Sequence, residues 1–129
     1  MKTLVAFGLL SCTMIAVAED NDCDSIETCQ TALKADRRSS LAHFRIAELY
    51  FRERNFQSSA NEFREALAGN LQPKWIEVWA HVNLGKIFDL TGQRERAVNE
   101  YRLARRTSDN TRGAQEIAER YSKEPYTGE

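Results

Sequence analysis

Residues 81–105 read HVNLGKIFDLTGQRERAVNEYRLAR, and this stretch decides the fold. Its apolar and small residues recur every three or four positions, which is the period of an amphipathic helix. Gly85 lies on the apolar face of the first helix, where glycine costs about 1 kcal/mol relative to alanine. A glycine in that position indicates that another backbone comes too close to leave room for a side chain.

The same pattern occurs 38 residues earlier, in HFRIAELYFRERNFQSSANEFREAL at residues 43–67. This register holds across two successive helices, so the sequence predicts a repeated helix-turn-helix, the signature of a solenoid. The matching positions are His43 with His81, Ile46 with Leu84, Ala47 with Gly85, Tyr50 with Phe88, Ser59 with Ala97, Phe63 with Tyr101 and Ala66 with Ala104.

Half-units of the repeat flank this pair. Residues 114–121 repeat the apolar face of the first helix, and residues 29–33 repeat that of the second. Because no strand-like alternation occurs, we expect an all-α chain with a flexible tail at 124–129. The expected helices lie at 24–37, 40–53, 56–68, 74–90, 93–107 and 111–123, grouped as full repeats at 40–68 and 74–107 and half-repeats at 24–37 and 111–123.

These residues resemble the tetratricopeptide repeat (TPR) family, which carries Leu-Gly and an aromatic in its first helix and Ala, aromatic, Ala in its second. The slots are filled by Leu84, Gly85, Phe88, Ala97, Tyr101 and Ala104, and more loosely by Ile46, Ala47, Tyr50, Phe63 and Ala66. The resemblance covers residues 24–123 and implies a TPR-like right-handed superhelix of antiparallel helical hairpins. In that architecture Gly85 and Ala97 let the paired helices approach closely.

The chain departs from the family pattern in two ways. His43 and His81 occupy a slot usually held by Trp or Leu, and the proline that often closes a repeat is missing after both units. Four extra residues also lie near AGNLQPKWIEVW at 68–79, so the helix that contains Trp75 and Trp79 should be longer than the family norm.

The chain opens with MKTLVAFGLLSCTMIAVAED, an uncharged run that follows one lysine and ends in small residues. This predicts a signal peptide at residues 1–18, cleaved after Ala18, and hence an exported protein, periplasmic or secreted. Two alternatives stay open. One is an uncleaved membrane anchor, although the run is short for a bilayer, and the other is lipid attachment at Cys12.

The charge balance argues against nucleic acid as a partner. The sequence has 18 basic and 19 acidic residues, for a net charge of −1, and residues 19–27 form an acidic stretch with no basic residue. The remainder is only mildly basic, which is too weak for a nucleic-acid surface. We expect contact with a membrane only if Cys12 is lipidated.

Cys23 and Cys29 remain after removal of the leader, and an even number of cysteines in an oxidising compartment favours a disulfide. Asp24 and Glu27 have the spacing of a capping box, which would place Cys23 just outside the helix and close to Cys29. The alternative is a free buried Cys29.

The sequence offers little that predicts catalysis. His43 and His81 occupy the same inward slot of successive repeats, so we interpret them as core histidines rather than metal ligands or catalytic groups. No nucleophile, phosphate-loop or metal motif accompanies them. We therefore expect no enzyme, no cofactor and no metal; an enzyme or ligand-binding protein that uses the two histidines is the less favoured alternative.

The first helices of TPR-like stacks line a concave groove, so the resemblance implies a non-catalytic protein-protein interaction module or scaffold of the cell envelope. Its partner would be a protein or peptide bound through side chains, because the helical backbone is already hydrogen-bonded. The alternative is a lipid-anchored or self-associating structural subunit, including a homodimer held by Trp75 and Trp79. The predicted groove residues are Phe44, Arg45, Glu48, Arg52, Val82, Asn83, Lys86 and Asp89.

Overall fold

The computed structural model describes residues 22–129, and the regular secondary structure in that range is entirely helical. The all-α prediction with six α-helices is confirmed, and the largest difference lies at the last helix, where a 3-10 helix replaces the first predicted turn. The elements are α1 (Ile26–Ala35), α2 (Ser40–Arg52), α3 (Phe56–Ala68), α4 (Trp75–Leu90), α5 (Arg94–Arg106), η1 (Thr111–Gly113) and α6 (Ala114–Lys123).

The predicted signal peptide at 1–18 and the alternative lipid site at Cys12 lie outside the described residues. Between residues 22 and 129, none of the helices combines the length and the apolar composition that a membrane span requires.

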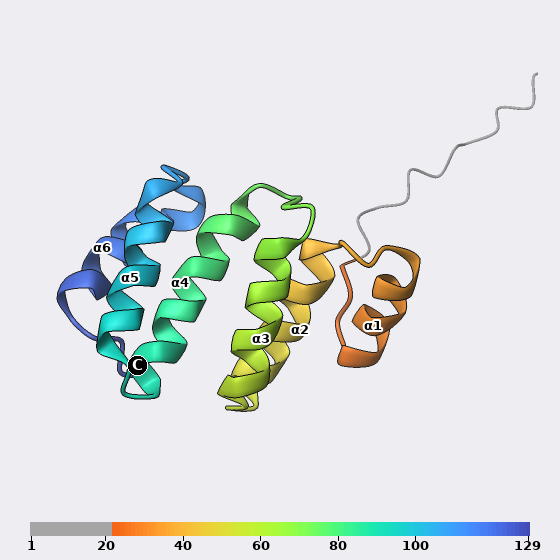
Figure 1. Ribbon diagram of the computed structural model, residues 1–129, viewed down its shortest axis with the longest axis horizontal. Helices are drawn as coiled ribbons and strands as arrows, with labels where there is room; N and C mark the ends of the chain where they lie inside the picture. Colours follow the sequence, from red (N-terminus) through yellow and green to blue (C-terminus); the bar gives the residue numbers. More distant parts are fainter. Residues whose placement is uncertain (1–21) are drawn as a thin grey trace, which may run out of the picture.

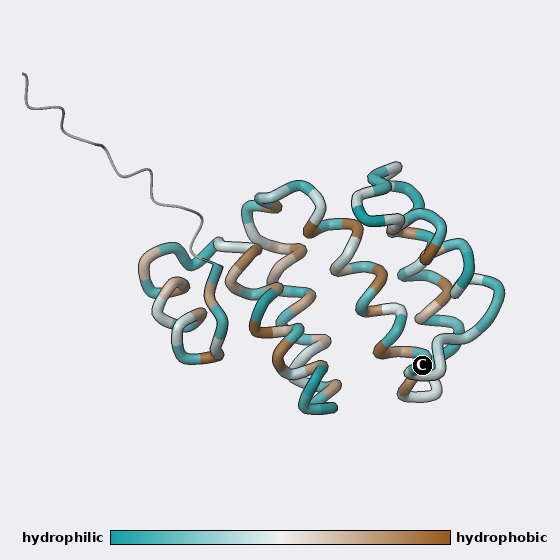
Figure 2. The backbone as a smooth tube through the Cα atoms, turned by 180° about the vertical axis from the view of Figure 1, so that it is seen from behind, coloured by the Kyte–Doolittle hydropathy of each residue, from teal (hydrophilic) through white to brown (hydrophobic). Residues whose placement is uncertain are grey.

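The helices pack mainly against their neighbours in sequence. The largest contacts join α2 with α3 and α4 with α5, and smaller ones join α5 with α6, α3 with α4 and α1 with α2. They follow one another along the long axis of the molecule, with α1 at one end and α6 at the other (Figure 1). Hydrophobic positions recur at intervals along the helices, which spreads the core along the row (Figure 2).

Helix α4 is the centre of the core. It has 16 residues, against 13 in α2, α3 and α5. Eight of its residues are buried, because it packs on α3 at one side and on α5 and α6 at the other. Its two tryptophans also contact the chain itself: the Trp75 ring lies edge-on to Phe44 with centroids 5.2 Å apart, and Trp79 Nε1 donates to the Thr111 carbonyl at 3.0 Å.

The space above Gly85 is filled by an aromatic ring. A Cβ atom built on Gly85 would lie 2.4 Å from Cε1 of Tyr101, a distance that real Cβ contacts do not show. The sequence predicted a close backbone approach, but the group that needs the room is the Tyr101 side chain from α5, which is fully buried. The glycine lowers the helix propensity of α4, but it leaves room for the Tyr101 ring to pack against the helix.

We expect Gly85→Ala to lower the free energy of unfolding by about 1 to 3 kcal/mol, although alanine is the better helix former. The added methyl group would overlap the buried Tyr101 ring, which would have to move. Chemical denaturation measures the change. The matched control is Ala47→Gly at the equivalent position of the preceding hairpin, which should cost about 1 kcal/mol. A more stable Gly85→Ala protein would contradict this account.

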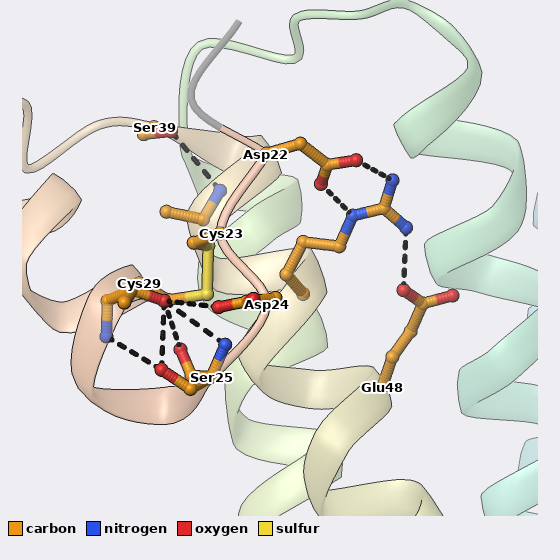
Figure 3. A network of polar contacts seen from close by, with 10 residues as sticks. Asp22, Cys23, Asp24, Ser25, Cys29, Ser39 and Glu48 are labelled. Carbon is orange, nitrogen blue, oxygen red and sulfur yellow. Dashed lines mark hydrogen bonds and ion pairs between the residues drawn. A yellow bond between two sulfur atoms is a disulfide. The ribbon is translucent and has the colours of Figure 1, made fainter.

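The N-terminal segment is fixed to α1 by a capping box and a disulfide. Ser25, rather than Asp24, is the N-cap: its hydroxyl accepts from the Thr28 amide at 3.1 Å, and the Ser25 amide donates to the Thr28 hydroxyl at 3.1 Å. The predicted Asp24–Glu27 box is therefore wrong by one residue, because a serine–threonine pair with the same spacing competes with it. A disulfide joins Cys23 to the buried Cys29 (Figure 3).

The C-terminal segment, residues 124–129, does not trail away from the domain as the sequence predicted. The backbone amide of Tyr126 donates to Oδ2 of Asp89 at 2.9 Å, and its ring lies edge-on to Tyr121 with centroids 5.2 Å apart. The chain ends beside the junction of α4 and α5 (Figure 1). A polar composition predicts exposure, but it does not reveal a partner that lies 37 residues away in sequence.

Candidate interaction site

A small pocket opens between α2 and α4, over the buried Phe63 in the middle of α3. Its cavity volume is about 260 Å³, and it is lined by Glu48, Phe51, Arg52, Phe63 and Asn83. The two phenylalanines provide an apolar floor, and one carboxylate, one guanidinium and one amide stand at its rim. A cavity of this size is smaller than the roughly 300 to 1,000 Å³ of sites for drug-sized ligands, so it fits one or two side chains.

Three of the eight predicted groove residues meet at this pocket: Glu48, Arg52 and Asn83. Arg52 is exposed and forms no ion pair with any residue between 22 and 129. The Asn83 side chain makes no hydrogen bond with the part of the chain that the structure describes, and it is not sealed from solvent. Both groups are therefore available to an incoming ligand.

A fourth predicted residue, Arg45, fixes the rim. Its Nε and one terminal nitrogen donate to the two carboxylate oxygens of Asp22 at 2.6 and 3.1 Å. The other terminal nitrogen donates to Oε2 of Glu48 at 2.8 Å. Asp22 thus points toward α2, and the guanidinium lies between it and Glu48 (Figure 3). The Glu48 carboxylate thus shares one guanidinium with Asp22, and that bond holds it in place at the pocket edge.

Phe44 and Val82, which were also predicted to face the groove, lie in the core. Phe44 is 2% exposed and Val82 is fully buried. Phe44 packs edge-on against both Phe63 and Trp75, with centroids 5.2 Å apart in each pair. The prediction assigned one packing stripe to each helix, but a helix inside the row has neighbours on both sides and buries a wider face.

Asp89, another predicted groove residue, is a buried acceptor. Its side chain is 1% exposed. Its oxygens accept from Nη1 of Arg94 at 3.0 Å and from the Tyr101 hydroxyl at 2.8 Å, in addition to the Tyr126 amide. Burial, followed by the bond to Asp89, raises the pKa of Tyr101 above its ordinary range, so its hydroxyl remains a donor.

Lys86, the last of the eight, lies among aromatic rings. Its Nζ is 5.1 Å from the ring centroid of Tyr126, 5.8 Å from that of Tyr121 and 6.0 Å from that of Trp79. Desolvation by these rings lowers the pKa of Lys86 below its usual value. The C-terminal segment therefore covers the part of the predicted groove that Lys86 and Asp89 would have formed.

Each of the two histidines pairs with a glutamate at the edge of the core. Nδ1 of His43 lies 2.7 Å from Oε2 of Glu62, and Nδ1 of His81 lies 2.7 Å from Oε2 of Glu100. The His43 and His81 side chains are 14% and 15% exposed, so they are less buried than the interpretation as core residues required. The signal was present in the sequence, since Glu62 and Glu100 are also 38 residues apart. Within residues 22–129, no group of three or more metal-ligating side chains is placed to hold an ion.

The same positions in the two hairpins make equivalent contacts with different chemistry. In the first, the rings of Phe51 and Phe56 meet with centroids 5.6 Å apart, and Phe51 lines the α2–α4 pocket together with the buried Phe63. Each of the three has a counterpart 38 residues later, and these counterparts are Asp89, Arg94 and Tyr101. An apolar cluster in one hairpin is thus replaced by a hydrogen-bonded network in the other.

A second depression, with a volume of about 420 Å³, lies between α1 and the loop that joins α3 to α4. Its polar groups are already engaged with the backbone. Asn70 Oδ1 accepts from the amides of Ser40 and Gln72, and Asp36 Oδ1 accepts from the Arg38 amide. Since these groups stabilise turns, the α2–α4 pocket is the better candidate for binding.

Comparison with models of known protein families, with curated proteins and with solved structures finds no match to this chain.

We expect Asp89→Ala to lower the free energy of unfolding by about 2 to 4 kcal/mol. The substitution leaves the buried Tyr101 hydroxyl without its acceptor and removes the partner of Arg94. Urea denaturation measures the loss. In a Tyr101→Phe background the same substitution should cost less, and equal costs in the two backgrounds would show that the hydroxyl contributes nothing.

The contribution of His43 to the stability of the fold should fall as pH rises from 6.5 through the folded-state pKa of His43. The hydrogen bond to Glu62 and the charges of Glu62 and Glu65 raise the pKa of His43 above 6.5, although burial opposes them. Because the folded-state pKa is the higher one, this contribution is fully present below pH 6.5 and disappears as pH rises through the folded-state value. Denaturation across this range should show a flatter pH profile for Glu62→Gln than for the exposed control Glu53→Gln. Parallel profiles would exclude the ion pair as the cause.

Proposed function

We propose that this chain is an exported, TPR-like interaction module, and that it binds a protein segment in the pocket between α2 and α4. The observation that carries the proposal is an apolar floor, Phe51 and Phe63, below an unpaired Arg52 and an unbonded Asn83 within the described residues. Charged and amide groups at the rim of an apolar pocket provide orientation, while the floor provides affinity.

The assignment to TPR-like hairpins is supported by contacts that recur at the offset of 38. The two histidine–glutamate pairs have the same distance and the same separation of 19 residues. In both hairpins a fully buried aromatic from the second helix, Phe63 or Tyr101, packs against the first. The right-handed superhelix that the family resemblance implies is part of this proposal.

A binding function is favoured over catalysis by the same duplication. A catalytic dyad is needed once in a site, whereas a pair that occurs in both hairpins with one geometry is what a structural element of the repeat would show. His43 and His81 are therefore interpreted as interhelical contacts. We accordingly propose no reaction and no cofactor.

The alternative of self-association through Trp75 and Trp79 receives less support. Trp75 packs on Phe44, and Trp79 donates to the Thr111 carbonyl, so both indoles already have partners in the chain. The proposed location, in the periplasm or outside the cell, depends on the leader at residues 1–18 and is tested by the mass of the mature protein.

Substitution of Arg52 should weaken partner binding and leave the stability of the fold unchanged. Full-length protein with Arg52→Glu is purified from the envelope after crosslinking. The amount of partner recovered with it should be at least about tenfold lower than with the unmodified protein. Arg106→Glu is the matched control, because Arg106 is likewise an exposed arginine in the last turn of its helix, α5.

Both variants should unfold at the same denaturant concentration as the unmodified protein, since both side chains are exposed. If the Arg52→Glu protein retains as much partner as the Arg106→Glu protein does, the α2–α4 pocket is not the binding site.

A further inference from the structure

The C-terminal segment shows how this fold accommodates an extended chain. Residues 124–129 are not helical, and they lie against α4 and α6. The Tyr126 ring lies against both Lys86 and Tyr121, and the Tyr126 amide donates to Asp89. Farther along, Gly128 is so close to Leu90 that a Cβ built on it would lie 3.5 Å from Cδ2 of that residue.

The residues that hold this segment have counterparts at the α2–α4 pocket. Subtracting the repeat offset of 38 from Lys86, Asp89 and Leu90 gives Glu48, Phe51 and Arg52. These are the three α2 residues that line the pocket, and Phe63, below them, is the counterpart of Tyr101. The pocket and the seat of the C-terminal segment are therefore the same position in successive hairpins, one open and one covered.

We propose that the α2–α4 pocket receives an aromatic side chain from an extended, acidic segment of a partner protein, as its counterpart receives Tyr126. The inference rests on the proposed function and specifies the class of ligand. The covered position serves as an internal example of the bound state.

The substitutions between the two positions determine what the ligand must carry. Phe51 replaces the acceptor Asp89, so the open pocket offers a ring to stack on in place of a carboxylate for a backbone amide. Arg52 replaces the apolar Leu90, and as an exposed cation it calls for a carboxylate on the ligand. Asn83, on α4, can donate to or accept from the ligand backbone.

Glu48 replaces Lys86 but does not repel an acidic ligand strongly. Its carboxylate already accepts from Arg45, which Asp22 also holds. The net charge of Asp22, Arg45, Glu48 and Arg52 is zero. Among the described residues, Arg52 is the only one of the four that has no ion-pair partner. A cavity of about 260 Å³ also suits a side chain on an extended backbone better than a whole helix, whose diameter is about 10 Å.

The test uses the segment that this chain itself supplies as a defined probe. An N-acetylated synthetic peptide with the sequence of residues 123–129, KEPYTGE, contains one aromatic residue, two glutamates and a terminal carboxylate. It is titrated into the ¹⁵N-labelled full-length protein, whose own C-terminal segment covers the second position. We expect amide signals of residues 48–52 and of Asn83 to shift in a saturable manner.

Three controls make the result specific. The peptide with Tyr126→Ala should bind at least about tenfold more weakly, and so should the unmodified peptide to the Arg52→Glu protein. The Arg106→Glu protein should bind the unmodified peptide with unchanged affinity. Equal affinity of the two peptides, shifts confined to residues 86–90, or no saturable shift at all would overturn the inference.

Failure of this inference is distinguishable from failure of the proposed function. If the peptide does not bind while Arg52→Glu still abolishes retention of the envelope partner, the pocket is a binding site but its ligand is not of the aromatic, acidic class. If retention is also insensitive to Arg52→Glu, both proposals are wrong.

Discussion

The Tyr101 ring can lie against α4 only because residue 85 has no side chain, and much of the second hairpin depends on that contact. With the ring in place, its hydroxyl reaches Asp89 at 2.8 Å. Asp89 in turn accepts from Arg94 at the start of α5 and from the backbone of the C-terminal segment. Three successive contacts thus connect Gly85 to the C-terminal segment: Gly85 with the Tyr101 ring, the Tyr101 hydroxyl with Asp89, and Asp89 with the Tyr126 amide. Removing the acceptor or filling the space would disturb α4, α5 and the segment after α6 together.

The two hairpins show that one backbone arrangement can be stabilised in two chemical ways. The first uses three phenylalanine rings and needs no polar partner. The second uses a carboxylate, a guanidinium and a phenol. The buried carboxylate accepts from the other two, while the guanidinium is 33% exposed and also donates to the Ser122 carbonyl. The polar version has a property that the apolar version lacks, since Asp89 has acceptor capacity left over for a backbone amide. The Tyr126 amide uses that capacity, which ties the C-terminal segment to the second hairpin.

The helices were predictable because their apolar period is strong, and the offset of 38 located equivalent positions. The limits of prediction lay where the outcome depends on neighbours in space. Ser25 displaced Asp24 as the N-cap through competition between two pairs of equal spacing, and Phe44 and Val82 were misplaced because an inner helix buries two sides. The histidine–glutamate pairs could have been found by extending the alignment to the glutamates. The seat of Tyr126 could not, because nothing near it in sequence indicates Asp89 or Lys86.

An array of repeats usually presents several similar subsites, so that a long ligand can be held at many points at once. Here residues 124–129 cover one such position on the second hairpin, through the contacts of Tyr126 with Asp89 and Tyr121. Of the two equivalent positions among the described residues, only the α2–α4 pocket is therefore open to a ligand.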